Sequence, residues 1–303
     1  MKKLYITLLC SVFSLFCQAQ QEPMYTQYLF NGLMYNPAYA GSRAWVSASL
    51  LYRHQWTQLE GAPKTATFSL HGQPTEKMGL GMNVYNDQLG VNRTTGFNGS
   101  YSYKIPLSKK HSLRLGVTGG IIQYNNNWDE LNIQDPDDPL FGLNNESFLL
   151  PTVGVGAYYY SERFFAGISL PQLMQHRLNK ENPDAQAQLL NHMYITFGAI
   201  FPVSSSVKLK PAVLMKQVSG RPFQVDANIT AIFNDYLWVG ATYRSNDGLA
   251  VMAEIHPKPQ WWFGYAYDYP ISDLGPQQIG THEIFIGFDL FKMDEAIFSP
   301  RYF

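Results

Sequence analysis

The sequence predicts an all-β protein: a single transmembrane antiparallel β-barrel of about fourteen strands in an outer membrane. Three observations predict this fold: an N-terminal export signal, repeated alternation of apolar and polar residues over about ten positions, and a composition that favours strands. Aromatic residues make up 15% of the 303 residues, and 24 residues are glycine. Beyond residue 19 no apolar run approaches the roughly 20 residues that a membrane-spanning helix needs, which excludes a bundle of transmembrane helices.

The first element is a signal peptide over residues 1–19. Lys2 and Lys3 form a short basic start, residues 4–16 are uncharged and mostly apolar, and Ala19 ends a small-residue cleavage pattern. A buried N-terminal helix and lipoprotein processing at Cys17 are weaker alternatives, because the apolar run is short and a bulky residue precedes that cysteine. We expect cleavage after Ala19 and export from the cytoplasm.

Both cysteines of the chain, Cys10 and Cys17, lie inside this signal peptide. The mature chain is therefore expected to fold without disulfides and to lack a cysteine nucleophile or a thiolate metal site.

Removing Lys2 and Lys3 from the 22 basic residues leaves 20 against 23 acidic residues. This mildly acidic balance argues against nucleic acid as a partner.

The second element is an N-terminal segment over residues 20–42. It is rich in Tyr, Asn and Gly and shows no alternation, and residues 36–41 predict a turn into the first strand. Three arrangements remain open: a periplasmic lead-in, a plug inserted into the barrel, or a short helix docked under it. A structural role is favoured over partner docking.

Residues 43–291 form the third element, the barrel. In residues 97–105, Phe97, Tyr101 and Tyr103 share one face of a predicted strand, while Ser100 and Ser102 share the other. Residues 223–233 repeat this pattern. Fourteen such segments begin near residues 44, 64, 78, 95, 112, 151, 163, 192, 206, 222, 236, 248, 260 and 280.

Loop lengths separate a membrane barrel from a soluble sandwich or propeller with the same alternation. The even-numbered connections are all short, near residues 71–77, 106–111, 161–162, 202–205, 234–235 and 257–259. The longest connections, 125–150 and 171–191, are odd-numbered, as is 272–279. Outer-membrane barrels have long outer loops and short periplasmic turns, whereas a soluble β-protein has no reason to sort its loops in this way.

Two further patterns concern the faces of the barrel. Aromatic residues gather towards strand ends, as interfacial girdles do, at 158–160, 164–165, 238, 261–263 and 265–269. The polar faces carry charges that we expect to line the lumen, where they face water or a bound segment: Lys208, Lys210, Lys216, Asp226, Glu254 and Asp268. A solvated lumen lining is favoured over a specific substrate site.

Several motifs go beyond the barrel pattern. They are QYLFNGLMYNPAYAG at residues 27–41, YRHQW at 52–56, GAP at 61–63, GTHEI at 280–284 and SPRYF at 299–303. In this order and spacing they resemble the PorP/SprF family of outer-membrane proteins, which is associated with type IX secretion and gliding motility in Bacteroidetes. The resemblance covers the whole chain.

The resemblance implies a non-enzymatic barrel that binds a secreted client protein, such as a large adhesin, and helps to export it or anchor it at the cell surface. The implied partners are outer-membrane lipid, type IX secretion components and the C-terminal region of the client, with no cofactor. The family motifs mark these positions for binding: Asn36, Pro37, Tyr39, Gly41, Arg53, Gln55, Trp56, Gly280, Thr281, His282, Glu283, Arg301 and Phe303. The alternative function is a passive or substrate-specific transport pore.

Enzyme chemistry finds little support in the sequence. Residues 167–171 read GISLP, which ends in Pro where a nucleophile elbow needs Gly, and residues 282–286 read HEIFI, which lacks the second histidine of a zinc helix. A weak calcium candidate, Asp135 with Asp137 and Asp138, lies in the longest outer loop, where a solvated acidic turn is the favoured interpretation. Residues 292–303 are expected to form a C-terminal tail.

Overall fold

The computed structural model describes residues 26, 28, 31–127, 129, 146–177, 188–219, 222–245, 248–271 and 279–291. Two short helices precede the strands: α2 (Gly32–Tyr35) and η2 (Pro37–Tyr39). The strands are β1 (Val46–His54), β2 (Lys64–Gly72), β3 (Met78–Leu89), β4 (Asn92–Pro106), β5 (His111–Asn126), β6 (Glu146–Ser161), β7 (Phe164–Leu170), β8 (His176–Arg177), β9 (Gln188–Leu189), β10 (His192–Ala199), β11 (Phe201–Pro202), β12 (Val207–Val218), β13 (Gln224–Phe233), β14 (Leu237–Arg244), β15 (Gly248–Lys258), β16 (Trp261–Pro270) and β17 (Thr281–Leu290).

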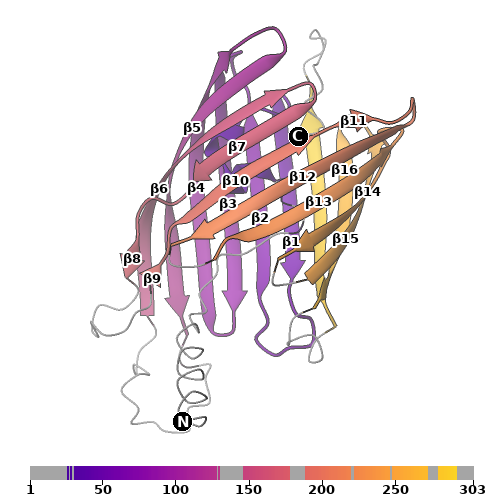
Figure 1. Cartoon of the computed structure of the whole chain (residues 1–303). Helices are drawn as coiled ribbons and strands as arrows, with labels where there is room; N and C mark the ends of the chain where they lie inside the picture. Colours follow the sequence, from indigo (N-terminus) through magenta and orange to yellow (C-terminus); the bar gives the residue numbers. More distant parts are fainter. Residues whose placement is uncertain are drawn as a thin grey trace, which may run out of the picture.

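The fourteen longer strands in the described ranges close into one antiparallel barrel (Figure 1). Successive strands pair along the sheet, β10 pairs with both β7 and β12, and β1 pairs with β17. Closure gives each of these strands a neighbour on both sides, which reduces the number of unpaired backbone groups that would be costly in lipid. The predicted barrel and its strand count are therefore confirmed.

Three two-residue strands lie outside the predicted set. β8 and β9 pair with each other inside the connection between β7 and β10, and β11 pairs with the start of β12. Two residues are too few to show an alternating pattern, so no periodicity marks these strands in the sequence.

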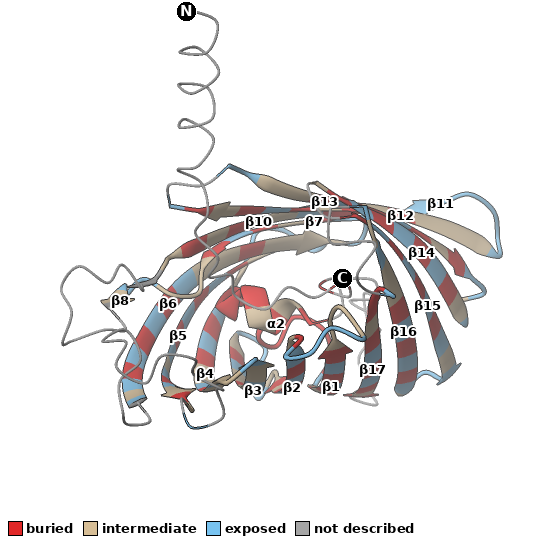
Figure 2. Ribbon diagram, turned by 90° about the horizontal axis from the view of Figure 1, so that it is seen from below, coloured by how far each residue is buried: buried red, intermediate tan, exposed pale blue. Residues whose placement is uncertain are grey.

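The two faces of the wall follow the predicted alternation, visible as banded strands in Figure 2. Phe97, Tyr101 and Tyr103 are exposed on the outside of the barrel, while Ser100 and Ser102 are buried on the lumen side. The exposed apolar side chains form the surface that meets lipid. No helix in the described part of the chain is long and apolar enough to cross a membrane.

The two ends of the barrel differ in their connections. One end carries the connections after β2, β4, β6, β13 and β15, which have at most five residues, and β1 begins there. The other end carries the long connections 55–63, 127–145, 171–191 and 271–280, together with three short ones at 90–91, 219–223 and 245–247. Because periplasmic turns are short and extracellular loops long, we term the first the inner end and the second the outer end.

The expected aromatic girdles are only partly correct. Tyr158, Trp238 and Trp262 are buried and point into the lumen, whereas Trp261 and Phe263 are exposed on the outside. Neighbouring residues of a strand point to opposite faces, so a run such as 261–263 cannot place all its rings in lipid. Part of the aromatic signal therefore belongs to the lumen.

Candidate functional site

The lumen of the barrel is occupied by the chain's own N-terminal residues. Figure 2 shows α2 inside the ring of strands. We define the lumen segment as Thr26, Tyr28 and residues 31–43, the described part of the chain before the barrel. Tyr28, Leu33 and Tyr39 are buried in the main apolar cluster of the molecule, which includes wall residues such as Phe285.

Glycines in the wall let this segment approach the strands. A Cβ added to Gly116 on β5 would lie 2.3 Å from the backbone nitrogen of Ala38. One added to Gly156 on β6 would lie 2.1 Å from Oδ1 of Asn36. Such contacts are too close for any real side chain, so these positions accept only glycine unless the segment moves.

The segment's helical turn is held in the middle of the lumen through Asn36. Its Oδ1 accepts a hydrogen bond from the backbone N–H of Ala38 at 2.9 Å, which caps η2, and its Nδ2 donates to the carbonyl oxygen of Ala157 at 2.9 Å. Pro37 occupies the first helical position, where a missing N–H costs nothing. Ser169 adds a hydrogen bond from its Oγ to the carbonyl oxygen of Tyr35 at 2.6 Å.

Arg114 on β5 holds the end of the segment that leads into β1. It donates from Nη1 to the carbonyl oxygen of Ala40 at 3.2 Å and from Nη2 to that of Gly41 at 2.7 Å. Ser102 donates to the same Ala40 oxygen at 2.6 Å and accepts from Arg114 at 3.0 Å. Arg114 is fully buried, so its charge depends on these carbonyl dipoles. Gly41 has φ +70°, a conformation that favours glycine.

At the outer end, Thr26 is held by three charged side chains of the wall. Its backbone N–H donates to Oε2 of Glu283 at 2.9 Å, and its hydroxyl donates to Oδ1 of Asp268 at 2.5 Å. Nη1 of Arg53 donates to the Thr26 hydroxyl at 2.9 Å. Arg53 also forms ion pairs with Asp268 at 2.8 Å and Glu283 at 3.0 Å.

A second arginine extends this group. Arg244 pairs with Asp226 at 3.0 Å and with Asp268 at 3.4 Å. We term Arg53, Asp226, Arg244, Asp268 and Glu283 the outer charge cluster. Charges buried this deeply are retained only when paired, so removing one member leaves the others uncompensated.

At the inner end, Arg43 anchors the segment to β17. Its Nε pairs with Oδ2 of Asp289 at 2.9 Å, and Ser47 donates to the other oxygen of that carboxylate at 2.6 Å. The guanidinium lies 3.9 Å from the ring centroid of Trp262, a cation–π arrangement. The buried Trp262 therefore has a role in the lumen that an interfacial girdle would not give it.

Two further buried lumen charges, Lys210 and Glu254, lie near Trp238. Nζ of Lys210 lies 5.1 Å from the ring centroid of Trp238, and His256 stacks on the same ring at 4.9 Å. Nε2 of His256 lies 2.5 Å from Oε1 of Glu254. The predicted lumen position of these charges is confirmed, but a solvated lining is wrong for the buried ones: Lys210, Lys216, Asp226 and Glu254 are almost fully removed from water.

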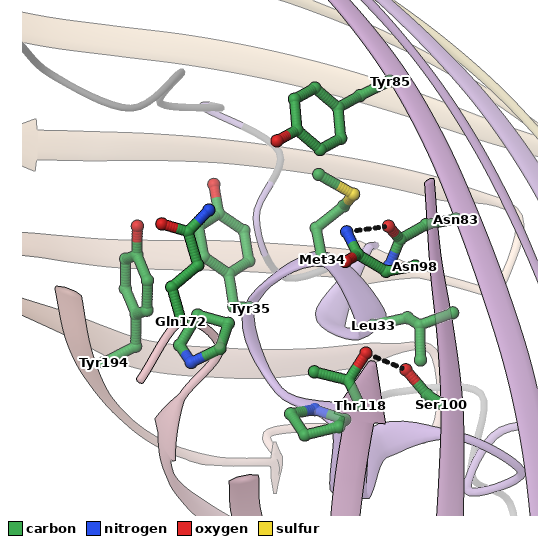
Figure 3. Close-up of a pocket in the computed structure, with 12 residues that line it drawn as sticks. Leu33, Met34, Tyr35, Asn83, Tyr85, Asn98, Ser100, Thr118, Gln172 and Tyr194 are labelled. Carbon is green, nitrogen blue, oxygen red and sulfur yellow. Dashed lines mark hydrogen bonds between the residues drawn. The ribbon is translucent and has the colours of Figure 1, made fainter. Parts of the chain in front are cut away.

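Open space remains beside the segment. An open recess, whose empty volume of about 650 Å³ includes solvent, lies between Leu33, Met34 and Tyr35 and the wall (Figure 3). Its barrel side carries polar side chains, with hydrogen bonds between Asn98 and Asn83 and between Ser100 and Thr118. A second, smaller recess lies at the outer mouth, next to the outer charge cluster. It is lined by Gln55, Trp56, Tyr269 and Thr281, among others.

The structure gathers most of the family-motif residues in two places. Asn36, Pro37, Tyr39 and Gly41 lie in the lumen segment, and Arg53 and Glu283 lie in the outer charge cluster. The remaining described motif residues, Gln55, Trp56, Gly280, Thr281 and His282, lie at the ends of β1 and β17.

At those strand ends the two motifs touch each other. The backbone N–H of Trp56 donates to Oγ1 of Thr281 at 3.1 Å, and that of Thr57 donates to the carbonyl oxygen of Gly280 at 2.9 Å. His282 faces outwards, with its Nδ1 2.6 Å from the hydroxyl of Tyr265. These contacts join β1 and β17 at the outer mouth.

Other predicted sites fall outside the described residues: the signal peptide, Arg301 and Phe303, and the calcium candidate Asp135, Asp137 and Asp138. Within the described ranges, no group of three or more His, Asp or Glu side chains is placed to hold a metal ion.

Sequence reasoning missed Arg114, Arg244 and the wall glycines. Alternation predicts that they face the lumen, but their partners lie far away in the chain: Gly41 is 73 residues from Arg114. The sequence does show a glycine or an arginine on a lumen-facing position of a strand. It does not show which distant residue packs against that position.

Comparisons with known proteins agree with this architecture. The sequence matches the family described as type IX secretion system membrane protein PorP/SprF over residues 17–288. No curated protein matches the sequence. Among solved structures, the CymD monoaromatic hydrocarbon channel matches at a TM-score of 0.52 and 11% identity, covering 86% of this chain and 93% of that one. The toluene transporter TbuX of Ralstonia pickettii matches at 0.50 and 8% identity, with the same coverage. At these identities the likeness shows the fold alone, that of an outer-membrane barrel.

Proposed function

Because this chain belongs to the PorP/SprF family of type IX secretion system membrane proteins, we propose that it binds a secreted client protein and helps to export it or anchor it at the cell surface. In this proposal the client is a large surface protein such as an adhesin, its C-terminal region makes the contact, and the barrel performs no catalysis. The barrel acts together with other components of the secretion system in the outer membrane.

The occupied lumen is the observation that carries the proposal. A diffusion pore needs a continuous aqueous path, yet here the lumen segment crosses the barrel and is held by the wall at three places. Arg53 contacts it at the outer end, Ala157 and Arg114 near the middle, and Asp289 at the inner end. Several of these contacts involve buried charges, which makes the segment costly to displace. This arrangement suits a barrel that holds a protein partner better than one that conducts solutes.

We place client binding at the outer end, because a secreted protein is met there. The long connections 127–145 and 171–191 belong to that end, and loops of this length commonly carry function. Exposed apolar side chains flank the outer connections at Leu59, Ile271 and Ile279. The inner end also exposes apolar side chains, such as Leu107 and Val203, so exposure alone does not choose between the ends.

A transport pore is the second candidate function. The open recess beside Leu33 and Met34 favours it, because this recess could extend into a path if the lumen segment shifted. Solved structures with a similar fold include a hydrocarbon channel and a toluene transporter, but their identities of 11% and 8% support only the fold.

Surface display of the client tests the proposal. We would replace connection 171–191 with a short linker and measure the client on intact cells by antibody labelling, after identifying it by pull-down of the tagged barrel from native outer membranes. The proposal expects display to fall while barrel abundance stays constant. A matched control replaces the inner turn 107–110, which should leave display unchanged. Equal display in the loop variant and the native protein would contradict the proposal.

A further inference from the structure

The lumen segment has a defined direction through the barrel. Thr26 contacts Arg53, the second-last residue of β1, and Asp268, close to the end of β16 at Pro270. Both strands end there at the outer end. Arg43 contacts Asp289, the second-last residue of β17, and Trp262, the second residue of β16, at the inner end.

Strand register measures the distance between these two levels. Glu283, which holds Thr26, lies opposite Arg53, and Asp289, which holds Arg43, lies opposite Ser47. Arg53 lies six positions after Ser47 on β1, which corresponds to about 20 Å along the strand at roughly 3.3 Å per residue. Because the strands of such barrels tilt by about 35–45°, the lumen segment descends about 15 Å along the barrel axis before β1 turns back.

Between these two levels the segment contacts three neighbouring strands. Tyr35 and Asn36 bind Ser169 on β7 and Ala157 on β6, and Ala40 and Gly41 bind Arg114, the fourth residue of β5 from the inner end. The described segment thus runs from the outer level at Thr26 to the inner level at Arg43.

We propose that the N-terminal side of the lumen segment faces the cell surface: Thr26 lies at the outer mouth, and the chain reaches the periplasmic side only where β1 begins. A partner that recognises the chain before Thr26 then meets it outside the cell. This proposal uses the outer-membrane orientation but does not depend on client binding.

Chain length argues against a return to the periplasm. The expected cleavage after Ala19 would leave six residues before Thr26, and six residues span at most about 20 Å when fully extended. A return through the barrel would need most of that length, and it would have to pass through a lumen already packed with Tyr28, Tyr39 and their neighbours.

Accessibility of an epitope tests the proposal. A short tag is added directly after Ala19, and two control chains carry it at Glu60, in the outer connection, or at Lys109, in the inner turn; both residues are exposed. We expect antibody binding on intact cells for the first tag and for the Glu60 tag, and binding at Lys109 only after the outer membrane is permeabilised. A first tag that behaves like the Lys109 tag overturns the proposal, and so does a reversed result for the two controls.

Chemical labelling of a single cysteine provides a second test, which can be used if the epitope tag prevents folding. The mature chain is expected to contain no cysteine, so one cysteine inserted after Ala19 is a unique site, with Glu60→Cys and Lys109→Cys as controls. A membrane-impermeant maleimide should label the inserted cysteine and Glu60→Cys on intact cells at least tenfold more than Lys109→Cys. Labelling of the inserted cysteine only after permeabilisation overturns the proposal. Neither assay uses client display, so the two proposals fail independently.

Discussion

The guanidinium of Arg114 on β5 donates a 2.7 Å hydrogen bond to the carbonyl oxygen of Gly41, which joins the barrel wall to the chain that fills it. The bond spans 73 residues of sequence and lies in a fully buried setting. It turns an N-terminal extension into part of the barrel's interior. Contacts of this kind hold the N-terminal segment inside the lumen.

Arg114→Ala should loosen the lumen segment. Hydrogen bonds from a charged group contribute about 1.5–3 kcal/mol, and the variant removes two that end on Ala40 and Gly41. We expect faster proteolysis of the segment and a lower unfolding temperature in detergent. Arg163→Ala, which removes an exposed arginine at the inner end, is the control. Equal proteolysis of the two variants would show that Arg114 does not hold the segment.

Gly116→Ala should destabilise the native packing, because its Cβ would lie 2.3 Å from the backbone nitrogen of Ala38. Overpacking of this kind costs about 1–3 kcal/mol. Gly99→Ala on the neighbouring strand is the control, since its Cβ would meet nothing closer than 3.8 Å. Thermal unfolding followed by gel mobility should show a lower midpoint for the first variant alone. A similar shift in both would mean that strand propensity, rather than the segment, requires glycine.

Arg53→Ala should be among the more damaging single changes in the wall. It leaves Asp268 and Glu283 without their main cation and removes a contact to Thr26, and breaking a buried pair costs about 3–5 kcal/mol. Lys110→Ala breaks the exposed pair with Glu162 and should cost about 0–1 kcal/mol. Denaturant unfolding in detergent measures the difference. Matching losses would contradict the inference that the outer charge cluster is structurally important.

A cross-link tests the position of the segment directly. A Cβ built on Gly81 lies 3.3 Å from the Cβ of Ala40, close to the separation in disulfides. The double variant Ala40→Cys with Gly81→Cys should oxidise to a disulfide, detected by altered gel mobility that a reductant reverses. Ala40→Cys with Gly99→Cys should not, because Gly99 has no group of the segment near its Cβ. Failure of the first pair to form would place the segment elsewhere.

The barrel itself was predictable because alternation reports directly which face of a strand meets lipid. The strand of residues 97–105 shows this, with Phe97 and Tyr101 outside and Ser100 inside. The contrast between short turns and long loops likewise distinguishes the two ends of the barrel, because loop length can be read from the spacing of the alternating segments alone.

The lumen was less predictable. Periodicity places the side chains of Asp226 and Glu254 in the lumen but does not predict their interaction partners. Arg53 and Asp268, for example, form an ion pair although 215 positions separate them in the sequence. The three alternatives for residues 20–42 could not be separated for the same reason, since the segment has no period and its fit depends on glycines of four different strands. The predicted interfacial position of Trp238 and Trp262 was wrong, because both side chains are buried in the lumen. The prediction followed the rule that aromatic residues near strand ends usually lie at the bilayer interface.

Conductance in planar bilayers tests the central claim most directly, because a lumen closed by its own N-terminal segment should carry little current. The mature protein is compared with a variant that lacks residues 20–39 but keeps Arg43 and all the strands. We expect the mature protein to be closed for most of the recording and the truncated variant to show large, steady openings. An equally large, steady current through both proteins would contradict a closed lumen and favour a transport pore.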